Sequence, residues 1–370
     1  MELILIITTG FTALLFSFLF MPAIIHISHK FNWYDRPGKR KIHKELIPRL
    51  GGVGIFLAFL LSIITVPLFF NLFIDNSLTH MLDLKYVSIF IGFSLIYFLG
   101  LVDDFYDLKA IFKFFIQIVA AGIVTLSGFV VSTISLPYLG DIDLGFIKYP
   151  ITILWIVGIT NAMNLVDGMD GLCGGITGFA ALSMGIISLI QPTPQVLPAI
   201  VAFALFGAVL GFLKFNFPPA KIFMGDSGSL FLGFILAVLP LLGISGSASI
   251  TSLLVPITIL MIPIIDTTAA IIRRVKKKRS IASPDKEHIH HKLLALGLSE
   301  KKILFVMYSV CAYLGIIAIT TVILPKEIPV YLTIIVWVGL LFGYGLLNLI
   351  QSKKKEMAKS AEENSKKFIL

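Results

Sequence analysis

The sequence predicts an all-α polytopic membrane protein, and three observations support this prediction. Of its 370 residues, 57% are apolar and only 14% are charged, whereas soluble domains have about 25% charged residues. The mean hydropathy is high, at +0.95. Apolar runs recur along the whole chain, each close to the ~20 residues that a helix needs to cross a bilayer. This pattern excludes an ordinary soluble globular protein.

Eleven apolar runs are predicted to be transmembrane helices. The first is too long for a signal-peptide core, and no basic residue precedes it, so we expect it to be retained. The expected spans are 3–28, 50–72, 85–102, 112–133, 149–164, 172–190, 196–213, 229–245, 250–272, 302–323 and 330–350. A single integral-membrane domain over residues 1–350 is therefore expected, followed by a polar tail over residues 351–370 that is a solvated helix or disordered.

The basic residues predict the orientation of the chain. Loops after odd-numbered spans, with the adjoining span ends and the tail, hold 27 of the 30 Lys and Arg, and the other side holds only Lys85, Lys148 and Lys326. The positive-inside rule makes the basic side cytoplasmic. We therefore expect the amino terminus outside and the carboxyl terminus in the cytoplasm. The net charge of +9 follows from this bias and from attraction to anionic lipid, so no nucleic-acid partner is expected.

The outer connections carry little chemistry. Most are short polar turns, and only the segment LPYLGDIDLGFIKYP is longer, with a Gly-Asp pair between apolar stretches. Such a pattern is compatible with a small outer hairpin near 136–149. The two cysteines, Cys173 and Cys311, lie inside apolar runs and predict no disulfide framework.

All of the unusual polar clusters fall on the predicted cytoplasmic side. Randomly scattered clusters would face outward about half of the time. In chain order the clusters are RPGKRKIHKELIPRLGG (36–52), DDFYDLKAIFK (103–113), NAMNLVDGMDGL (161–172), NFPPAKIFMGDSGS (216–229) and RRVKKKRSIASPDKEHIHHKL (273–293). The sequence therefore predicts one active site at the inner membrane surface.

The cluster DDFYDLK follows an apolar run directly. A carboxylate at bilayer depth costs at least ~2.5–3.5 kcal/mol, so these acids are not explained by stability. An acidic helix N-terminus, which the macrodipole favours, is the plain alternative. Three acids, Asp103, Asp104 and Asp107, followed by Lys109 and Lys113, instead favour a cation site. Hard oxygen ligands suit Mg²⁺, with Mn²⁺ as the alternative.

The clusters NAMNLVDGMDGL and MGDSGS also bring acids to span ends. Asn161 and Asn164 are three residues apart, as are Asp167 and Asp170, so these side chains can converge at a helix end. A plain interfacial turn rich in Asn, Asp and Gly remains the alternative. Asp226 lies between glycines, where backbone amides bind anions and the carboxylate can hold a metal. The neighbouring serines are equally explained as helix caps.

The segment HIHH supplies His288, His290 and His291 among basic residues. No cysteine accompanies them and the spacing is not H-x-x-x-H, so phosphate binding fits better than zinc. A solvated basic face explains Lys276 to Arg279, but it does not explain the histidines. For Asp266, inside the ninth span, a structural ion pair and a catalytic role both remain open.

Taken together, the clusters favour transfer from a nucleotide diphosphate donor to a lipid. Acids hold a divalent metal and bases bind phosphates, so that the chemistry rests on positioning and charge neutralisation. No G-x-x-x-x-G-K-[ST] loop is present, which disfavours an ATP-driven machine. A transporter is the alternative of another class, but carriers place ionisable groups near the midplane, whereas these acids lie at span ends.

Over roughly residues 1–323 the chain resembles the polyprenyl-phosphate N-acetylhexosamine-1-phosphate transferases of glycosyltransferase family 4. The shared motifs, in family order, are PRLGG, DDFYDLK, NAMNLVDGMDGL, FMGDSGS and PDKEHIHHKL. The resemblance implies a Mg²⁺-dependent enzyme of the bacterial inner (cytoplasmic) membrane with its active site facing the cytoplasm. Such enzymes transfer a sugar 1-phosphate from a UDP-sugar to undecaprenyl phosphate and release UMP. The partners implied are these two substrates and the lipid bilayer, and a homodimer is left open.

The histidine segment bears on the donor sugar. The related phospho-MurNAc-pentapeptide translocase has three consecutive histidines, whereas Ile289 interrupts the run here. KIHKELIPRLGG and PDKEHIHHKL are similar to the WecA/TagO-like branch, which implies UDP-GlcNAc as donor. The product would be the first lipid intermediate of a cell-surface polysaccharide such as O-antigen or teichoic acid. Another UDP-2-acetamido sugar and UDP-MurNAc-pentapeptide remain alternatives.

The resemblance also implies roles for single residues. Asp103 and Asp104 match paired acids that serve the lipid phosphate; which of them acts as base is open. Asp167, Asn216 and Phe223 match positions near uridine. The catalytic candidates are Asp103, Asp104, Asp167, Asp170, His288, His290 and His291. The substrate-binding candidates are Arg49, Lys113, Asn161, Asp167, Asn216, Phe223 and the same three histidines. The metal-ligand candidates are Asn164 and Asp226.

Overall fold

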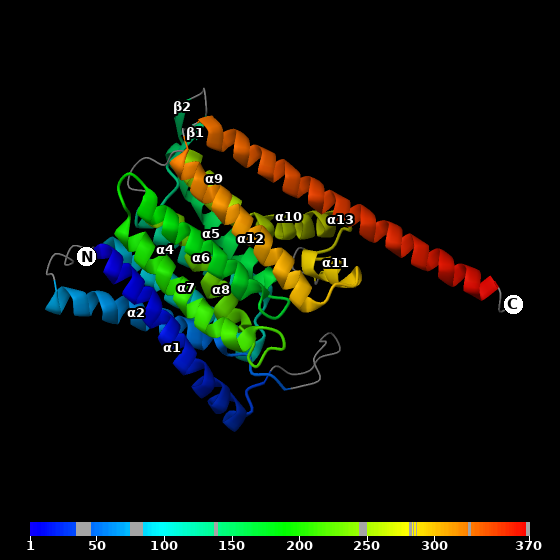
Figure 1. Cartoon of the computed structure of the whole chain (residues 1–370), viewed down its shortest axis with the longest axis horizontal. Coiled ribbons are helices and arrows are strands. Elements are labelled where there is room, and N and C mark those ends of the chain that lie inside the picture. Colours follow the sequence, from blue (N-terminus) through cyan, green and yellow to red (C-terminus); the bar gives the residue numbers. More distant parts are fainter. Residues whose placement is uncertain are drawn as a thin grey trace.

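The computed structural model is a bundle of helices with one small hairpin (Figure 1). The structure describes residues 1–34, 46–74, 84–136, 140–243, 250–280, 283, 285, 287–324 and 327–367. The helices are α1 (Glu2–Phe31), α2 (Gly51–Phe73), α3 (Leu84–Tyr106), α4 (Ala110–Leu126), α5 (Lys148–Val166), α6 (Leu172–Ile190), α7 (Val196–Asn216), α8 (Gly225–Leu242), α9 (Ile250–Ile259), α10 (Met261–Lys276), α11 (Ile289–Ala295), α12 (Glu300–Ile323) and α13 (Glu327–Lys367). The predicted all-α class is confirmed.

Ten of the eleven predicted spans each overlap one helix, and the ninth overlaps two. Among the described residues, nine helices are long and apolar enough to cross a membrane, and α4 is a shorter apolar helix. The fourth span ends at Leu126 rather than at residue 133, because Gly128 turns into the left-handed region at φ +97°. The chain is thus a multi-pass membrane protein.

The ninth predicted span, 250–272, is divided into α9 and α10 at Leu260. Pro263 has no N–H to donate to the carbonyl of Ile259, and its ring clashes with that carbonyl, so α9 ends there. Leu260 takes φ −95° and ψ 17°, and α10 begins at the next residue. The prediction of one continuous helix was therefore wrong at this point, and the sequence signal for the break was the proline.

Helix α8 lies at the centre of the bundle. In the most apolar 18-residue stretch of α8, 83% of the residues are buried, whereas in that of α13, at the periphery, 11% are buried. Helices α2, α3, α5, α6 and α7 all pack against α8. Because neighbours surround α8, the residues at its amino end, including Asp226, are held by several elements at once.

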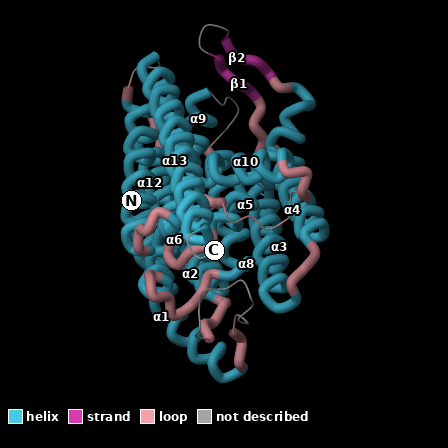
Figure 2. Tube along the Cα trace, turned by 90° about the vertical axis from the view of Figure 1, so that its right-hand side faces the viewer, coloured by secondary structure: helices cyan, strands magenta, loops and turns pink. Residues whose placement is uncertain are grey.

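A hairpin is present close to the predicted position, and its place on the outer side stays a prediction. Strands β1 (Thr133–Leu136) and β2 (Gly140–Asp143) pair antiparallel, with Thr133 opposite Asp143. The hairpin begins three residues before the predicted 136–149 and ends before the 3-10 turn η2 (Gly145–Ile147). It projects from the bundle beside the start of α5 (Figure 2). Since α5 ends at Val166, next to the acidic motifs, hairpin and motifs lie at opposite ends of the bundle.

Helix α13 continues far beyond membrane length. It runs to Lys367 as one helix, so the predicted boundary between residues 350 and 351 falls inside it. Figure 1 shows its carboxyl half extending past the rest of the bundle. Of the two forms expected for the polar tail, the helical one is observed.

Candidate active site

Backbone pairing joins the PRLGG motif to the FMGDSGS motif. The N–H of Phe223 donates to the carbonyl of Pro48 over 2.7 Å, and the N–H of Gly51 donates to the carbonyl of Phe223 over 2.9 Å. Gly225 has φ +77°, and a Cβ there would lie 2.5 Å from the carbonyl oxygen of Arg49. Only glycine permits this approach, which places the side chain of Arg49 at the start of α8.

Asp104 caps α8 from a different helix. Its carboxylate accepts the N–H of Asp226 over 2.7 Å and the N–H of Ser227 over 3.0 Å. Its side chain is 1% exposed and lies 3.4 Å from Nε of Arg49. A carboxylate is favoured there because the first amides of a helix lack partners and carry partial positive charge. Asp104 therefore fixes the end of α8 that carries Asp226.

Asp103 points elsewhere, as side chains about 100° apart on a helix must. Its carboxylate accepts the N–H of Leu108 and the ammonium of Lys113, each over 2.7 Å. Its side chain is 2% exposed. Asp107, between these residues, adopts φ 48°, so the bond to Leu108 closes a tight turn between α3 and α4. Asp103 thereby orients Lys113.

Asp226 is the meeting point of the motifs. Its Oδ1 accepts the amide of Asn164 over 2.8 Å and lies 3.5 Å from Nη2 of Arg49. Its Oδ2 lies 3.7 Å from Nζ of Lys113, and the carboxyl group of Asp103 is its neighbour. The side chain of Asp226 is 19% exposed, more than that of either paired aspartate. It is thus the acid best placed to meet a substrate.

The donor set around Asp226 fits a divalent cation of the magnesium type. Two neighbouring carboxylates, on Asp103 and Asp226, and the amide oxygen of Asn164 are hard oxygen donors. Among the described residues, no group of three or more His, Cys, Asp and Glu side chains could by itself hold a metal ion. A Mg²⁺ ion at Asp226 would therefore need further ligands, and substrate phosphates commonly supply them.

Asp170 and Asn216 form hydrogen bonds that stabilise the loops near Asp226. Asp170 accepts the N–H of Ala220 over 3.1 Å. Asn216 accepts the N–H of Gly171 over 2.9 Å and donates to the carbonyl of Ile222 over 2.8 Å. Both side chains are buried, and they connect the segment after α5 to the segment after α7. These three hydrogen bonds join the two side chains to backbone groups that shape the site.

Asp167, directly after α5, is half-buried. Withdrawal from water, together with the negative charge of Asp226, raises the pKa of its carboxyl group to about 8. Ionised Asp167 is therefore unfavourable in the folded protein without a cation. A bound cation would offset that cost.

We expect Asp167→Asn to raise the unfolding temperature in EDTA, with a gain that grows between pH 5 and pH 8.5. Unfolded Asp loses its proton near pH 4, while folded Asp167 keeps it until about pH 8, so the parent loses stability as pH rises through this interval. The variant escapes this loss. Thermal unfolding in detergent at several pH values measures the difference, and a gain independent of pH would contradict the assignment.

A matched control uses a carboxyl group with the opposite shift. Asp285 accepts two bonds from Arg273, and although burial opposes them these bonds lower the pKa of Asp285. Its ionised form stabilises the fold above the pKa of the unfolded chain. Asp285→Asn should therefore lower the unfolding temperature throughout pH 5 to 8.5.

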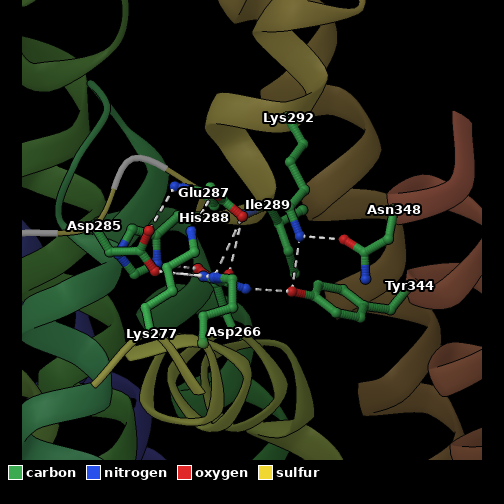
Figure 3. A network of polar contacts seen from close by, with 10 residues as sticks. Asp266, Lys277, Asp285, Glu287, His288, Ile289, Lys292, Tyr344 and Asn348 are labelled. Carbon is green, nitrogen blue, oxygen red and sulfur yellow. Dashed lines mark hydrogen bonds and ion pairs between the residues drawn. The ribbon is translucent and has the colours of Figure 1, made fainter. Parts of the chain in front are cut away.

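The histidine segment reaches the same centre from α11. Asp266 accepts the N–H of Ile289 over 3.0 Å, and its other oxygen lies 3.0 Å from Nδ1 of His288 (Figure 3). His290 is 2% exposed, and within the described part of the chain its Nε2 has no hydrogen-bond partner. A Cβ on Gly168 would lie 2.8 Å from this nitrogen. An unpaired buried nitrogen beside an open glycine is suited to a ligand oxygen.

The electrostatic state of His290 follows from its surroundings. Burial, reinforced by His291, lowers its pKa to about 4, so the imidazole is neutral at pH 7 when no ligand is bound. A neutral imidazole still donates one hydrogen bond to a phosphate oxygen. The ring centroids of His290 and His291 are 4.2 Å apart, so the two histidines act on the same small region.

The structure adds residues that sequence reasoning missed. Gln117 of α4 is 2% exposed and accepts the amide of Asn161, which also donates to the carbonyl of Val157 over 2.8 Å. Asn161 is thus engaged with α4 rather than with Asp226. A polar side chain in an apolar run was the available signal for Gln117. Tyr308 donates to the carbonyl of Gly171 over 2.6 Å, and nothing in the sequence indicated this contact.

Part of two motifs lies outside the described residues. Of RPGKRKIHKELIPRLGG, the structure describes the chain from Leu46 onward, and in PDKEHIHHKL it does not describe Pro284 and Lys286. The predicted contribution of KIHKE therefore stays a prediction. Every residue proposed for catalysis, substrate binding or metal binding is described, and Asp103, Asp104, Asn164 and Asp226 are brought together with Arg49 and Lys113.

Comparison with known proteins points in the same direction. The family model described as Glycosyl transferase family 4 matches residues 86–244. A Bacillus subtilis protein named probable undecaprenyl-phosphate N-acetylglucosaminyl 1-phosphate transferase is 37% identical over 336 residues, covering 90% of this chain and 89% of that protein. A decaprenyl-phosphate N-acetylglucosaminephosphotransferase of Mycolicibacterium smegmatis is 32% identical over 332 residues, covering 84% and 79%. An Escherichia coli K12 undecaprenyl-phosphate alpha-N-acetylglucosaminyl 1-phosphate transferase is 29% identical over 360 residues, covering 93% and 92%.

Proposed function

We propose that this chain transfers GlcNAc-1-phosphate from UDP-GlcNAc to undecaprenyl phosphate, since it belongs to the polyprenyl-phosphate N-acetylhexosamine-1-phosphate transferases of glycosyl transferase family 4. The names of the relatives support the sugar and the class of lipid. One structural observation carries the proposal: Arg49 and Lys113 converge on Asp226 where membrane helices end. This arrangement favours an enzyme acting on phosphates over a transporter.

The proposed reaction is a phosphoryl substitution. An oxygen of the lipid phosphate attacks the β-phosphorus of UDP-GlcNAc and forms a new P–O–P bond. The bond from that phosphorus to the oxygen bridging to the α-phosphate breaks, and UMP leaves with the electron pair. The product is undecaprenyl-diphospho-GlcNAc, so no oxidant or further co-reactant is needed.

The residues around Asp226 have complementary tasks in this reaction. The guanidinium of Arg49 and the ammonium of Lys113 bind phosphate oxygens and bring two anionic substrates together. Asp226 and Asn164 would hold Mg²⁺, which when bound neutralises the diphosphate and the leaving UMP. Asp104 keeps Asp226 in place by capping α8. His290 and its neighbours donate hydrogen bonds to the donor's phosphates.

A general base is a secondary requirement here. The second pKa of a phosphate monoester is near 6, so the acceptor is mostly dianionic at pH 7. We propose Asp103 as the acid nearest to the acceptor, where it orients Lys113 and takes a proton from any singly protonated lipid phosphate. Lys113 would thus contact both the lipid phosphate, which is the nucleophile, and Asp103, which is the base.

The distribution of basic residues is the basis for the proposed membrane side and cellular location of the reaction. The basic side of the chain predicts that the active site faces the cytoplasm, from which a UDP-sugar is supplied, and that the protein lies in the bacterial inner membrane. A second copy of the chain remains a candidate partner. The lipid product would open a cell-surface polysaccharide such as teichoic acid or O-antigen.

We expect UDP-GlcNAc to be the donor, because Ile289 interrupts the histidine run. Membranes containing the chain, undecaprenyl phosphate and Mg²⁺ should convert radiolabelled UDP-GlcNAc into a lipid-soluble product. Excess unlabelled UDP-GlcNAc should suppress the signal, while UDP-MurNAc-pentapeptide should leave it unchanged. Lipid product from the pentapeptide donor alone would overturn the choice of branch and leave the reaction class intact.

A further inference from the structure

The carboxyl-terminal helix α13 is hydrogen-bonded to the segment that carries the histidines, and these contacts of Tyr344, Asn348 and Lys354 are called the grip of α13 below. Tyr344 accepts hydrogen bonds from Arg273 of α10 and from Lys292 of α11, each over 2.8 Å (Figure 3). Lys292 also donates to Asn348, and Lys354 donates to the carbonyl of Ala295 over 2.7 Å. α13 therefore contacts α11 at its middle and at its carboxyl end.

Lys292 makes this grip energetically important. It is 1% exposed, and within the described part of the chain its ammonium group donates only to Tyr344 and Asn348. A buried cation without partners is strongly unfavourable, so the oxygens that α13 supplies stabilise the position of α11. The ammonium also lies 4.2 Å from the ring centroid of Tyr344, which adds a cation–π contact.

Arg273 extends the grip to the other side of the histidines. It bonds Asp285 over 2.6 Å, three residues before His288. Its side chain is 17% exposed, and a pocket of about 440 Å³ lies against it and Tyr344. Water can therefore reach Arg273, whereas Lys292 depends on protein partners. The hydroxyl oxygen of Tyr344 thus binds Arg273, on the helix before the histidines, and Lys292, directly after them.

These contacts of α13 also affect the position of His290. His288 and the N–H of Ile289 are held by Asp266, on the same helix as Arg273. His290, two residues before Lys292, faces Gly168 in the loop between α5 and α6. The position of His290 relative to Gly168 is therefore set by contacts of α10 and α11, and α13 joins those two helices.

We propose that Tyr344 is a positioning residue for the reaction: its hydroxyl locks α10 to α11 and thereby holds His290 in place for the donor's diphosphate. The hydroxyl does not touch the substrate. Its effect is on donor binding, because a loosened histidine segment must be ordered again each time the donor binds. This inference rests on the proposed function and adds that α13, outside the matched family region 86–244, is part of the catalytic scaffold.

The test compares Tyr344→Phe with Tyr313→Phe in the full chain. Tyr313 on α12 is 51% exposed, so its variant controls for the loss of a tyrosine hydroxyl. Three quantities are measured in detergent: hydrogen exchange of the amides of residues 289–295, the kcat, and the KM for UDP-GlcNAc. We expect Tyr344→Phe to speed exchange and to raise KM about tenfold with kcat within about twofold, since two charge-assisted bonds are lost.

The outcomes separate the proposal from its premise. Exchange and KM unchanged from the parent overturn the positioning role, and so does a loss of folded protein with an unchanged KM. Faster exchange with an unchanged KM overturns the link between the histidines and the donor. Absence of transfer by the unmodified chain, with faster exchange in the variant, overturns the proposed function but leaves the grip of α13 intact. Asn348→Ala provides a second variant, expected to act in the same direction.

Discussion

Asp226→Asn is expected to lower the rate of GlcNAc-1-phosphate transfer at least ~10²-fold, about 2.7 kcal/mol in activation free energy. The substitution removes a negative charge from the point where Arg49, Lys113 and Asn164 converge. A diphosphate donor and a phosphate acceptor cannot share this site with the acids unless a cation neutralises them. The variant should also show a weaker dependence on Mg²⁺ concentration, measured in a titration with EDTA-treated protein.

The matched control for this prediction is Asp143→Asn. Asp143 lies in the hairpin at the opposite end of the bundle and accepts only a local bond from Gly145 among those described. Its variant should keep the parent rate and the parent response to Mg²⁺. Undiminished transfer in EDTA by the parent protein would show that the acids do not act through a divalent cation.

Asp103→Asn and Asp104→Asn are expected to differ although the residues are neighbours. In Asp103→Asn the new amide group can accept from Leu108 but not from Lys113, so the lysine loses its closest anionic partner. We expect turnover to fall about tenfold or more, by the loss of a charged hydrogen bond. If Asp103 only removes a proton from the acceptor, part of the rate should return as pH rises above 6, where the lipid phosphate loses that proton unaided.

Asp104→Asn should act on the metal and on stability instead. Each oxygen of Asp104 accepts one backbone N–H at the start of α8, and an amide can satisfy only one of them. A lost cap lowers the free energy of unfolding by about 0.5–2 kcal/mol. Because Asp226 moves with the end of α8, the Mg²⁺ concentration for half activity should rise. Superimposable pH–rate profiles and Mg²⁺ titrations for the two variants would contradict this division of roles.

Much of the fold could be predicted from hydropathy, because a bilayer demands long apolar helices with internally satisfied backbones. Within the described part of the chain, hydropathy located nine helices long enough to cross a membrane and the shorter apolar helix α4. Hydropathy is insensitive to a break within an apolar run, so the division at Leu260 required attention to Pro263. It is equally insensitive to a helix that continues into water, which is why the tail of α13 remained ambiguous.

The sequence predicted which residues form the site better than it predicted how they contact one another. Asp226 was singled out because its glycine neighbours are a local signal that a sequence displays. The capping of α8 by Asp104 joins residues 122 apart in the sequence, and no local pattern encodes such a pairing. The same holds for Tyr344, which lies in an apolar helix and becomes informative only once α10 and α11 are seen beside it.

The most direct test of the central claim is transfer from UDP-GlcNAc labelled with ³²P at the β-phosphate. Purified chain, undecaprenyl phosphate and Mg²⁺ should move the label into the organic phase and release unlabelled UMP, because the bond between the two phosphates of the donor breaks. Label retained in water-soluble UDP, with GlcNAc alone on the lipid, would show that the bond to the sugar breaks instead and would contradict the account.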